Sequence, residues 1–269
     1  MTTLFSSDIY RLVRSKAALF GMLGAVAFAA GIPLASYCAS VRRDGGSYEV
    51  FGQNGVEILN VVSSILIFWL AVFVAFFAAA EFQHGTVRNG LALGKSRVLI
   101  YFSKFLCTVM TLALAFLTAG VAATLANTAL CGFGDMAAAE FVPYFAMNCG
   151  MWLLYALPYA AVFCAIAFIC RSPALTVALG VAFMFTMSLA AQGLLGYVDA
   201  AGPLNIALRA IPMYYSMAFG YLDIFMGITT VYGAGGQAAF FRDSAVVCAG
   251  YVAAACAAGC FAFARKDVK

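Results

Sequence analysis

Apolar residues fall into six long runs along the chain, and the polar and charged residues gather between these runs. A helix needs roughly 20 mainly apolar residues to cross a bilayer. Runs of sufficient length occupy residues 17–41, 60–80, 102–130, 144–170, 174–197 and 245–264. The pattern predicts an all-α integral membrane protein with six transmembrane helices in a single transmembrane domain, residues 1–269.

A short amphipathic pattern precedes the first run, in the segment LFSSDIYRLVRSK. At helical spacing its apolar residues share one face, and these are Leu4, Phe5, Ile9, Leu12 and Val13. The opposite face carries Ser7, Asp8, Arg11, Arg14 and Ser15. The pattern predicts an interfacial helix whose basic residues are attracted to anionic lipid at the cytoplasmic leaflet. A plain continuation of the first span fits the same residues, because element boundaries are poorly defined by sequence.

A less regular apolar segment covers residues 204–230, between the fifth and sixth runs. Arg209, Pro212 and Asp223 interrupt it, and a lipid-facing span with such residues would be costly. We therefore expect one or two short re-entrant helices on the outer face, shielded by protein, with GAGG at 233–236 as a flexible connector.

The basic residues are distributed unevenly between the two ends of the predicted spans. Four lie on the side predicted to be outside, namely Arg42, Arg43, Arg209 and Arg242. The other side has eleven, namely Arg11, Arg14, Lys16, Arg88, Lys95, Arg97, Lys104, Arg171, Arg265, Lys266 and Lys269. Because the cytoplasmic side carries the Lys/Arg excess, both termini are predicted to be cytoplasmic.

Composition supports the membrane assignment, because 65% of the residues are hydrophobic and only 10% are charged, against about a quarter charged in soluble domains. Ionisable residues are nearly absent from the six runs; Glu81 and Lys104 lie at run ends. Ion-coupled transporters and redox carriers usually need such residues at membrane depth. The single histidine, His84, excludes a bis-histidine haem, and no CxxC pair suggests a metal site.

Three local patterns suggest chemistry and each has a simpler explanation. NGLALGKSR at 89–97 resembles a phosphate-binding P-loop but leaves three residues, not four, between Gly90 and Gly94. GFGD at 132–135 matches an intramembrane aspartyl protease motif, yet no second span supplies an aspartate at the depth of Asp135, so a loop is favoured. Cys131 and Cys149 flank one outer loop, where either a disulfide or two thiols would fit. No catalytic, cofactor-binding or metal-binding residue is therefore assigned.

The loop between the second and third runs has the sequence EFQHGTVRNGLALGKSRVLIYFSKFL, residues 81–106. It resembles the membrane subunits of exporter-type (type 2) bacterial ABC transporters. In that family a glutamate ends the second span, and a Gly-Thr pair, a short helix, a Ser-Arg pair and a lysine follow. The matching residues are Glu81, Gly85, Thr86, Ser96, Arg97 and Lys104. This chain has Gly94-Lys95 where the family often has proline.

The resemblance has a physical rationale. Thr86 can cap a helix from residue 87 to about 93, with Gly94 as its end, so that a short rod projects between two spans. In the family, this coupling helix sits in a groove on the ATPase subunit. The resemblance assigns an ATPase-coupling loop, 81–104, with these residues: Glu81, Gly85, Thr86, Val87, Leu91, Ser96 and Arg97. A solvated turn whose charges only set topology is the alternative.

The resemblance implies a multi-pass permease of the bacterial cytoplasmic membrane. Two separate ATP-binding subunits would carry ATP and Mg²⁺, so this chain would need no cofactor and would not itself be an enzyme. A second permease copy or a homologous permease would complete the pathway; membrane lipid is a further expected partner, nucleic acid is not. The alternative is a non-transporting membrane scaffold or sensor that docks a cytoplasmic partner.

The substrate class follows only weakly from the residues. The second run contains the aromatic residues Phe68, Trp69, Phe73, Phe76 and Phe77. They favour an amphipathic or hydrophobic cargo such as an antimicrobial peptide, lipid or drug. Lipid-facing or helix-packing roles fit the same residues. A link to antimicrobial peptide resistance is only a family-level expectation. Small residues recur every four positions in the last run, at 249–257 and 250–258, and suit either close helix contact or simple filler.

Overall fold

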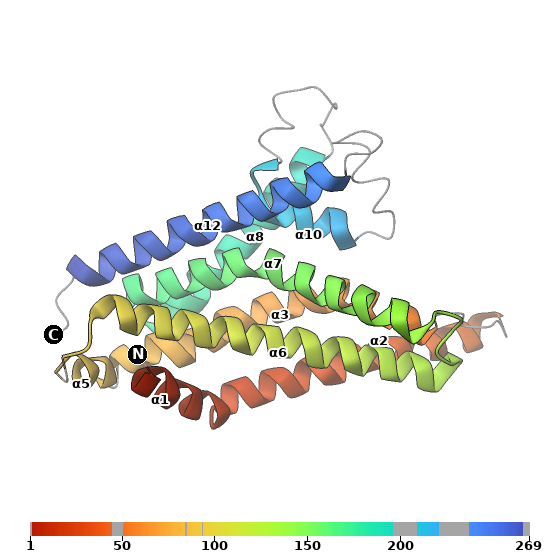
Figure 1. The fold of residues 1–269 in the computed structure, drawn as a ribbon, viewed down its shortest axis with the longest axis horizontal. Helices are drawn as coiled ribbons and strands as arrows, with labels where there is room; N and C mark the ends of the chain where they lie inside the picture. Colours follow the sequence, from red (N-terminus) through yellow and green to blue (C-terminus); the bar gives the residue numbers. More distant parts are fainter. Residues whose placement is uncertain are drawn as a thin grey trace. The chain divides into compact units, whose positions relative to one another are not determined.

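The computed structural model describes residues 2–44, 51–83, 85–92, 94–195, 209–220 and 237–265, and every regular element in these ranges is a helix (Figure 1). Within the described ranges six helices are long and apolar enough to cross a membrane. They are Lys16–Ser40, Gly52–Gln83, Arg97–Cys131, Ala138–Cys170, Pro173–Gly193 and Ala238–Arg265. The prediction of an all-α membrane protein with six spans is confirmed.

Most helices extend beyond the apolar runs that predicted them. The long helices are α2 (Lys16–Asp44), α6 (Arg97–Cys131), α7 (Ala138–Cys170), α8 (Pro173–Leu195) and α12 (Gln237–Arg265). The last begins eight residues before position 245, where the apolar run begins. Hydropathy detects only the segment that matches the hydrocarbon, whereas the backbone hydrogen bonds of a helix continue into the polar region on each side.

The second span is the least regular of the six. It begins with the 3₁₀-helix η1 (Gly52–Ile58), continues as α3 (Leu59–Val74), widens into the π-helix η2 (Ala75–Ala79) and ends in α4 (Ala80–Gln83). Four of the five π-helical residues are buried. Single π-turns inside α-helices occur often at functional sites, and this one lies immediately before the turn that carries Glu81.

The N-terminal amphipathic segment forms its own helix, α1 (Thr2–Val13). Arg14 and Ser15 separate it from α2, and the Ser15 hydroxyl accepts a hydrogen bond from the Ala18 N–H at 3.3 Å. The alternative of a plain continuation of the first span is therefore wrong. The assignment of its two faces also needs correction, because Asp8 is buried and Val13 is 74% exposed. Asp8 points inward because an ammonium and a hydroxyl group on α6 donate hydrogen bonds to its carboxylate there.

Between α8 and α12 the described residues contain the short helix α10 (Pro212–Gly220), which packs against both. It lies within the segment predicted to hold one or two short helices. Pro212 occupies its first position, where the missing N–H costs no helical hydrogen bond. Asp223 and the GAGG connector lie outside the described residues.

By backbone contacts the chain divides into two compact units, and α3, α6 and α7 contribute residues to both. One unit comprises Arg14–Leu66 and Met110–Leu153. In it, η1 packs closely on α6, since a Cβ atom on Gly55 would lie 2.6 Å from the Thr124 Cα. The GFGD motif forms the turn after α6, with positive φ angles at Gly132 and Gly134 and an exposed Asp135, as the loop interpretation predicts.

The other unit comprises Met1–Val13, Ile67–Val109 and Leu154–Lys269. The aromatic residues of the second span divide between its interior and its surface. Phe73 and Phe77 are buried with ring centroids 5.2 Å apart, whereas Phe68 and Phe76 are exposed. The aromatic run therefore serves packing on one face, and only its other face is open to lipid or to another subunit.

The structure also shows the surroundings of the small residues in α12 and the state of Cys131 and Cys149. The small residues of α12 at 249–250, 253–254 and 257–258 are exposed. Gly259, in contrast, contacts the Tyr101 ring, which a Cβ atom would approach to 2.6 Å. No disulfide joins Cys131 to Cys149, so both are thiols.

Candidate coupling site

Glu81, in the last turn of the second span, holds two cationic side chains. Its Oε1 atom accepts a hydrogen bond from Lys104 Nζ at 2.5 Å and another from Arg11 Nη1 at 2.8 Å. Lys104 comes from the second turn of α6 and Arg11 from the last turn of α1. One carboxylate thus connects the second span, the third span and the N-terminal helix.

Asp8 supplies the second carboxylate. Its Oδ1 atom accepts a hydrogen bond from Lys104 Nζ at 2.8 Å, and its Oδ2 atom accepts one from Ser103 Oγ at 2.5 Å. The Lys104 ammonium also lies 4.4 Å from the centroid of the Phe77 ring, where a cation–π contact is favourable. Lys104 therefore has a partner on α1, on α4 and on the π-helical turn.

These charged residues form a buried ion cluster, which we define as Asp8, Arg11, Glu81 and Lys104. The Lys104 and Asp8 side chains are 3% and 6% exposed, Glu81 is 16% exposed, and Arg11 is half exposed. Two acids and two bases balance, so the cluster as a whole carries no net charge. Burying each ion costs several kcal/mol, which the partner interactions roughly offset. Removing one member alone would leave its partner uncompensated, so the cluster resists separation of its three helices.

The helix predicted for the loop is present as α5 (Thr86–Ala92). Gly85 precedes it with φ +67° and Gly94 follows it with φ +74°, so a glycine in the left-handed region bounds each end. The Gly94 N–H bonds the Leu91 carbonyl at 2.9 Å, which agrees with Gly94 as the stop. The Thr86 hydroxyl donates to the Glu81 carbonyl at 3.2 Å, a contact different from the predicted cap. Val87 is buried.

The Ser-Arg pair begins the third span. Ser96 Oγ accepts the Leu99 N–H at 3.2 Å, which is N-cap geometry for α6. The Arg97 guanidinium donates at 2.9 Å to each of the Phe263 and Ala264 carbonyls. Those carbonyls lie in the last turn of α12, where a cation interacts favourably with the helix dipole. Arg97 thus joins the loop to the sixth span.

An aromatic cluster holds the same ends of the helices together. Phe82, directly after Glu81, meets Phe168 of α7 and Phe263 of α12 edge to face, with centroids 5.3 and 5.8 Å away. Phe168 and Phe263 also meet each other at 5.0 Å. Arg171, at the end of α7, lies 5.5 Å over the Phe82 ring. Movement of the residue next to Glu81 must therefore displace the ends of the fourth and sixth spans as well.

The structure gathers only part of the predicted loop set into one place. Glu81, Gly85 and Thr86 lie in consecutive turns beside the ion cluster, and Val87 is buried on α5. Ser96 and Arg97 make their contacts at the opposite end of the loop. Leu91, on α5 between the two ends of the loop, is half-buried.

Sequence reasoning missed three members of this site, Asp8, Arg11 and Ser103. The first two were placed on the lipid-headgroup face of α1, and Ser103 was not singled out. An acid and a base one turn apart on a short helix were the available signal, but the pairing to residues 70 and 95 positions away was not visible. Within the described residues no three Asp, Glu, His or Cys side chains gather as a metal site.

A family model described as "ABC-2 family transporter protein" matches residues 4–189. The match covers more than two thirds of the chain and includes most of α1, the loop and the whole ion cluster. The chain belongs to the ABC-2 transporter family. A search of curated proteins found no match.

Membership makes this chain an ABC transporter permease, a multi-pass membrane subunit of a kind that generally works with ATP-binding subunits. The family implies a non-catalytic role for such a subunit. In this ABC-2 permease the described residues connect the loop and α1 to the third and sixth spans through direct charged contacts.

Proposed function

We propose that this ABC-2 permease couples ATP hydrolysis by separate subunits to export, through the loop 81–104. The observation that carries the proposal is the buried ion cluster. If a partner subunit pushes on the short helix of the loop, the transmembrane helices move with it only if both ends of that helix are held firmly to them. Here Glu81 and Arg97 lie one at each end of the loop, and their charged contacts link four helices. Glu81 joins its own helix, α4, to α1 and α6, and Arg97 joins its own helix, α6, to α12.

The loop has flexible and rigid positions, and their order along the chain determines how a displacement of α5 would reach the spans. The two positive-φ glycines allow α5 to change its angle, while the salt bridges and caps outside them resist separation. A push on α5 by an ATPase would therefore be transmitted as a rotation of the second and third spans together, with α1 and α12 following.

The rest of the proposal concerns the complex. Two ATP-binding subunits, which hold ATP and Mg²⁺, dock on two permeases, either two copies of this chain or this chain and a relative. Both termini face the cytoplasm of a bacterial cell, as the Lys/Arg bias supports. The cargo is an amphipathic or hydrophobic compound such as an antimicrobial peptide, lipid or drug. The near absence of ionisable residues from the apolar runs supports ATP, not an ion gradient, as the energy source.

A non-transporting scaffold or sensor would use the same spans and the same loop to hold a partner. The buried cluster favours the transporter, because a docking turn has no need to be fastened to four helices. The two functions differ in one measurable quantity, which is whether hydrolysis by the partner depends on the cluster.

The experiment is an affinity purification of the tagged chain in mild detergent, with mass spectrometry and an ATPase assay of the co-purified proteins. Wild type is compared with Glu81→Gln, which removes the charge but keeps the shape, and with Glu140→Gln, an exposed acid at the start of α7, as the matched control. We expect an ATP-hydrolysing partner with all three chains. In reconstituted vesicles, export per ATP hydrolysed should fall at least tenfold in Glu81→Gln alone.

Two outcomes would contradict the proposal. A preparation without any ATPase, repeated under gentler extraction, would shift the assignment to the scaffold. A Glu81→Gln complex with wild-type export per ATP would show that the cluster is only structural, provided that the variant inserts and purifies like the control.

A further inference from the structure

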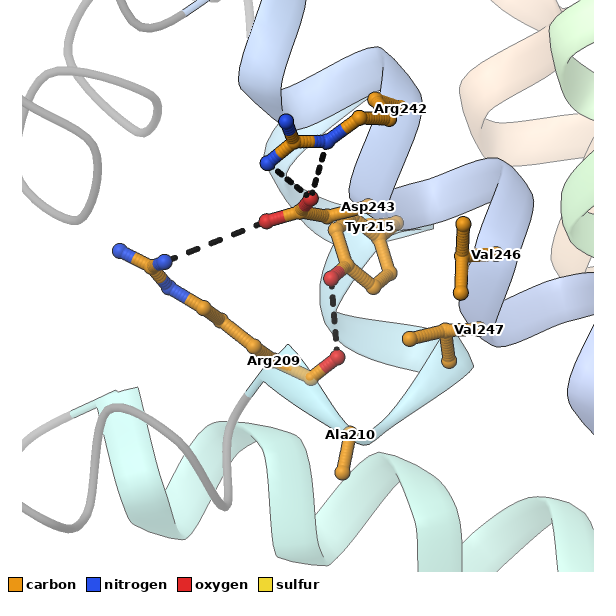
Figure 2. Close-up of a pocket in the computed structure, with 7 residues that line it drawn as sticks. All are labelled: Arg209, Ala210, Tyr215, Arg242, Asp243, Val246 and Val247. Atoms are coloured by element: carbon orange, nitrogen blue, oxygen red, sulfur yellow. Dashed lines mark hydrogen bonds and ion pairs between the residues drawn. The ribbon is translucent and has the colours of Figure 1, made fainter.

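An open surface pocket of about 440 Å³, called the cavity below, lies far from the coupling site, where the start of α12 meets the segment before α10. Figure 2 shows its lining, which is Arg209, Ala210, Tyr215, Arg242, Asp243, Val246 and Val247. Neither the family match nor the proposed coupling mechanism uses it.

The polar side of the cavity is built around one carboxylate. Arg242 Nε and Nη2 both donate to Asp243 Oδ1 at 3.1 Å, and Arg209 Nη1 lies 4.0 Å from Asp243 Oδ2 (Figure 2). Two guanidinium groups and one carboxylate give these lining residues a net charge of +1. Each guanidinium has five N–H donors in a fork that matches phosphate oxygens, so the arginines can accept an anion alongside Asp243.

The other side of the cavity is apolar. Val246 and Val247 follow one turn below Arg242 and Asp243 on α12, and Ala210 and the Tyr215 ring complete the wall. Tyr215 is fixed in place by its hydroxyl, which donates to the Arg209 carbonyl at 2.9 Å, and by the Phe240 ring at 5.4 Å. A ligand with an anionic head and a hydrocarbon body would meet complementary surfaces on both sides.

The sixth span places this cavity at the boundary of the bilayer. The 21 residues from 244 to 264, between Asp243 and Arg265, carry no charge. They make about 32 Å of helix at 1.5 Å per residue, which matches the roughly 30 Å of the hydrocarbon core. Arg242 and Asp243 therefore lie at headgroup level, and the two valines lie at the top of the hydrocarbon.

We propose that this cavity binds a phosphate group, held between Arg209 and Arg242, and that the valine wall receives the chain attached to it. An anionic phospholipid and free inorganic phosphate share that chemistry. Asp243 keeps the two arginines positioned and weakens the binding by its own charge. The inference does not depend on the coupling role of Glu81 and holds for whichever face of the membrane this end of α12 occupies.

The test measures phospholipid binding by native mass spectrometry of the full chain purified with its partners. The probes are phosphatidylglycerol and phosphatidylcholine. The Arg209→Gln/Arg242→Gln variant should weaken phosphatidylglycerol binding about fivefold per arginine, the ratio expected for a basic side chain near a membrane surface. Asp243→Asn should strengthen it by a similar factor, and Val247→Trp, which fills the cavity without a charge change, should weaken it.

Arg265→Gln, which removes a charge from the other end of the same helix, is the matched control and should leave the affinity unchanged. A second arm titrates inorganic phosphate into the protein in phosphatidylcholine nanodiscs by calorimetry. Lipid binding lost in the double variant identifies the lipid as the source, and phosphate heats lost there without lipid selectivity identify the free anion. If neither readout distinguishes the variants from wild type, or if Asp243→Asn weakens both, the proposal fails.

Discussion

Lys104 has the most demanding environment of any single residue in the coupling site. Its side chain is 3% exposed and its ammonium lies between Asp8 and Glu81, with the Phe77 ring nearby. A buried ammonium is tolerated only when its donors are satisfied, because the desolvation cost is large. The contacts of Lys104 stabilise the packing of α1, α4 and α6, and the proposed function also gives Lys104 a part in transmitting displacement, so a test must measure stability separately from export.

A double-mutant cycle on Asp8 and Lys104 tests the cluster as a stabilising unit. Asp8→Asn and Lys104→Met should each lower the thermal midpoint in detergent, since each leaves a buried charge without one partner. The double variant should be less destabilised than the sum of the two, by about 1–3 kcal/mol. Additive effects would mean that the 2.8 Å contact carries no net interaction energy.

Arg97 should affect coupling more than stability. Arg97→Ala removes two hydrogen bonds to carbonyls at the end of α12, a loss of about 1–3 kcal/mol in total. Because the guanidinium ties the loop to the sixth span, ATP hydrolysis should continue while export falls. Arg97→Lys, which keeps the charge but not the two-carbonyl fork, should show a smaller loss. Wild-type export in Arg97→Ala would remove this residue from the coupling loop.

At the scale of the element, α5 is a short rod between two glycine joints. A helix of seven residues is marginal by itself, so its order depends on its ends and on the burial of Val87. Gly85 and Gly94 have open space where a Cβ would stand. A substitution at either position therefore changes only the backbone strain, so its effect on stability reports on the loop alone.

Gly85→Ala and Gly94→Ala should each cost about 1–2 kcal/mol of local stability, the penalty for a side chain in the left-handed region. The penalty falls on the loop, so limited proteolysis should cut within residues 84–95 faster while the global thermal midpoint changes little. Gly150→Ala, inside α7 with open space around it, is the control and should be neutral or slightly stabilising. Equal protease resistance in all four chains would contradict the strained-joint description.

Close approach of η1 to α6 gives a contrasting glycine prediction. A Cβ on Gly55 would lie 2.6 Å from the Thr124 Cα and 2.8 Å from its N atom, both backbone atoms that cannot rotate away. Gly55→Ala should therefore destabilise the protein by about 1–3 kcal/mol through overpacking. The thermal midpoint in detergent measures this loss. Gly24→Ala is the matched helical control, because nothing lies within 4 Å of where its Cβ atom would stand.

At the scale of the whole molecule, the described residues consist of six candidate membrane spans and short helices, and the proposed function places nucleotide binding on separate subunits. The loop that imitates a P-loop is too short by one residue and forms the helix α5 with a capped entry into α6. We expect no nucleotide binding by the isolated chain, and no change on Lys95→Ala. Equilibrium dialysis with labelled ATP measures this, and saturable binding that Lys95→Ala abolishes would reverse the assignment.

The hydrophobic pattern by itself determined the number of spans and their order, because the bilayer imposes a length that shows directly in sequence. It also located the loop, since turn glycines and caps are local signals. Whether the N-terminal segment continues the first span was decided by the structure, in which α1 ends at Val13. Tertiary structure decided which way Asp8 and Val13 point, that Lys104 joins two carboxylates, and that Arg97 caps the sixth span. Such pairings join residues 23 to 167 positions apart on different helices, and periodicity along one helix carries no information about its partners. The same reason hid the cavity at Arg209 and Arg242, whose two arginines come from separate segments.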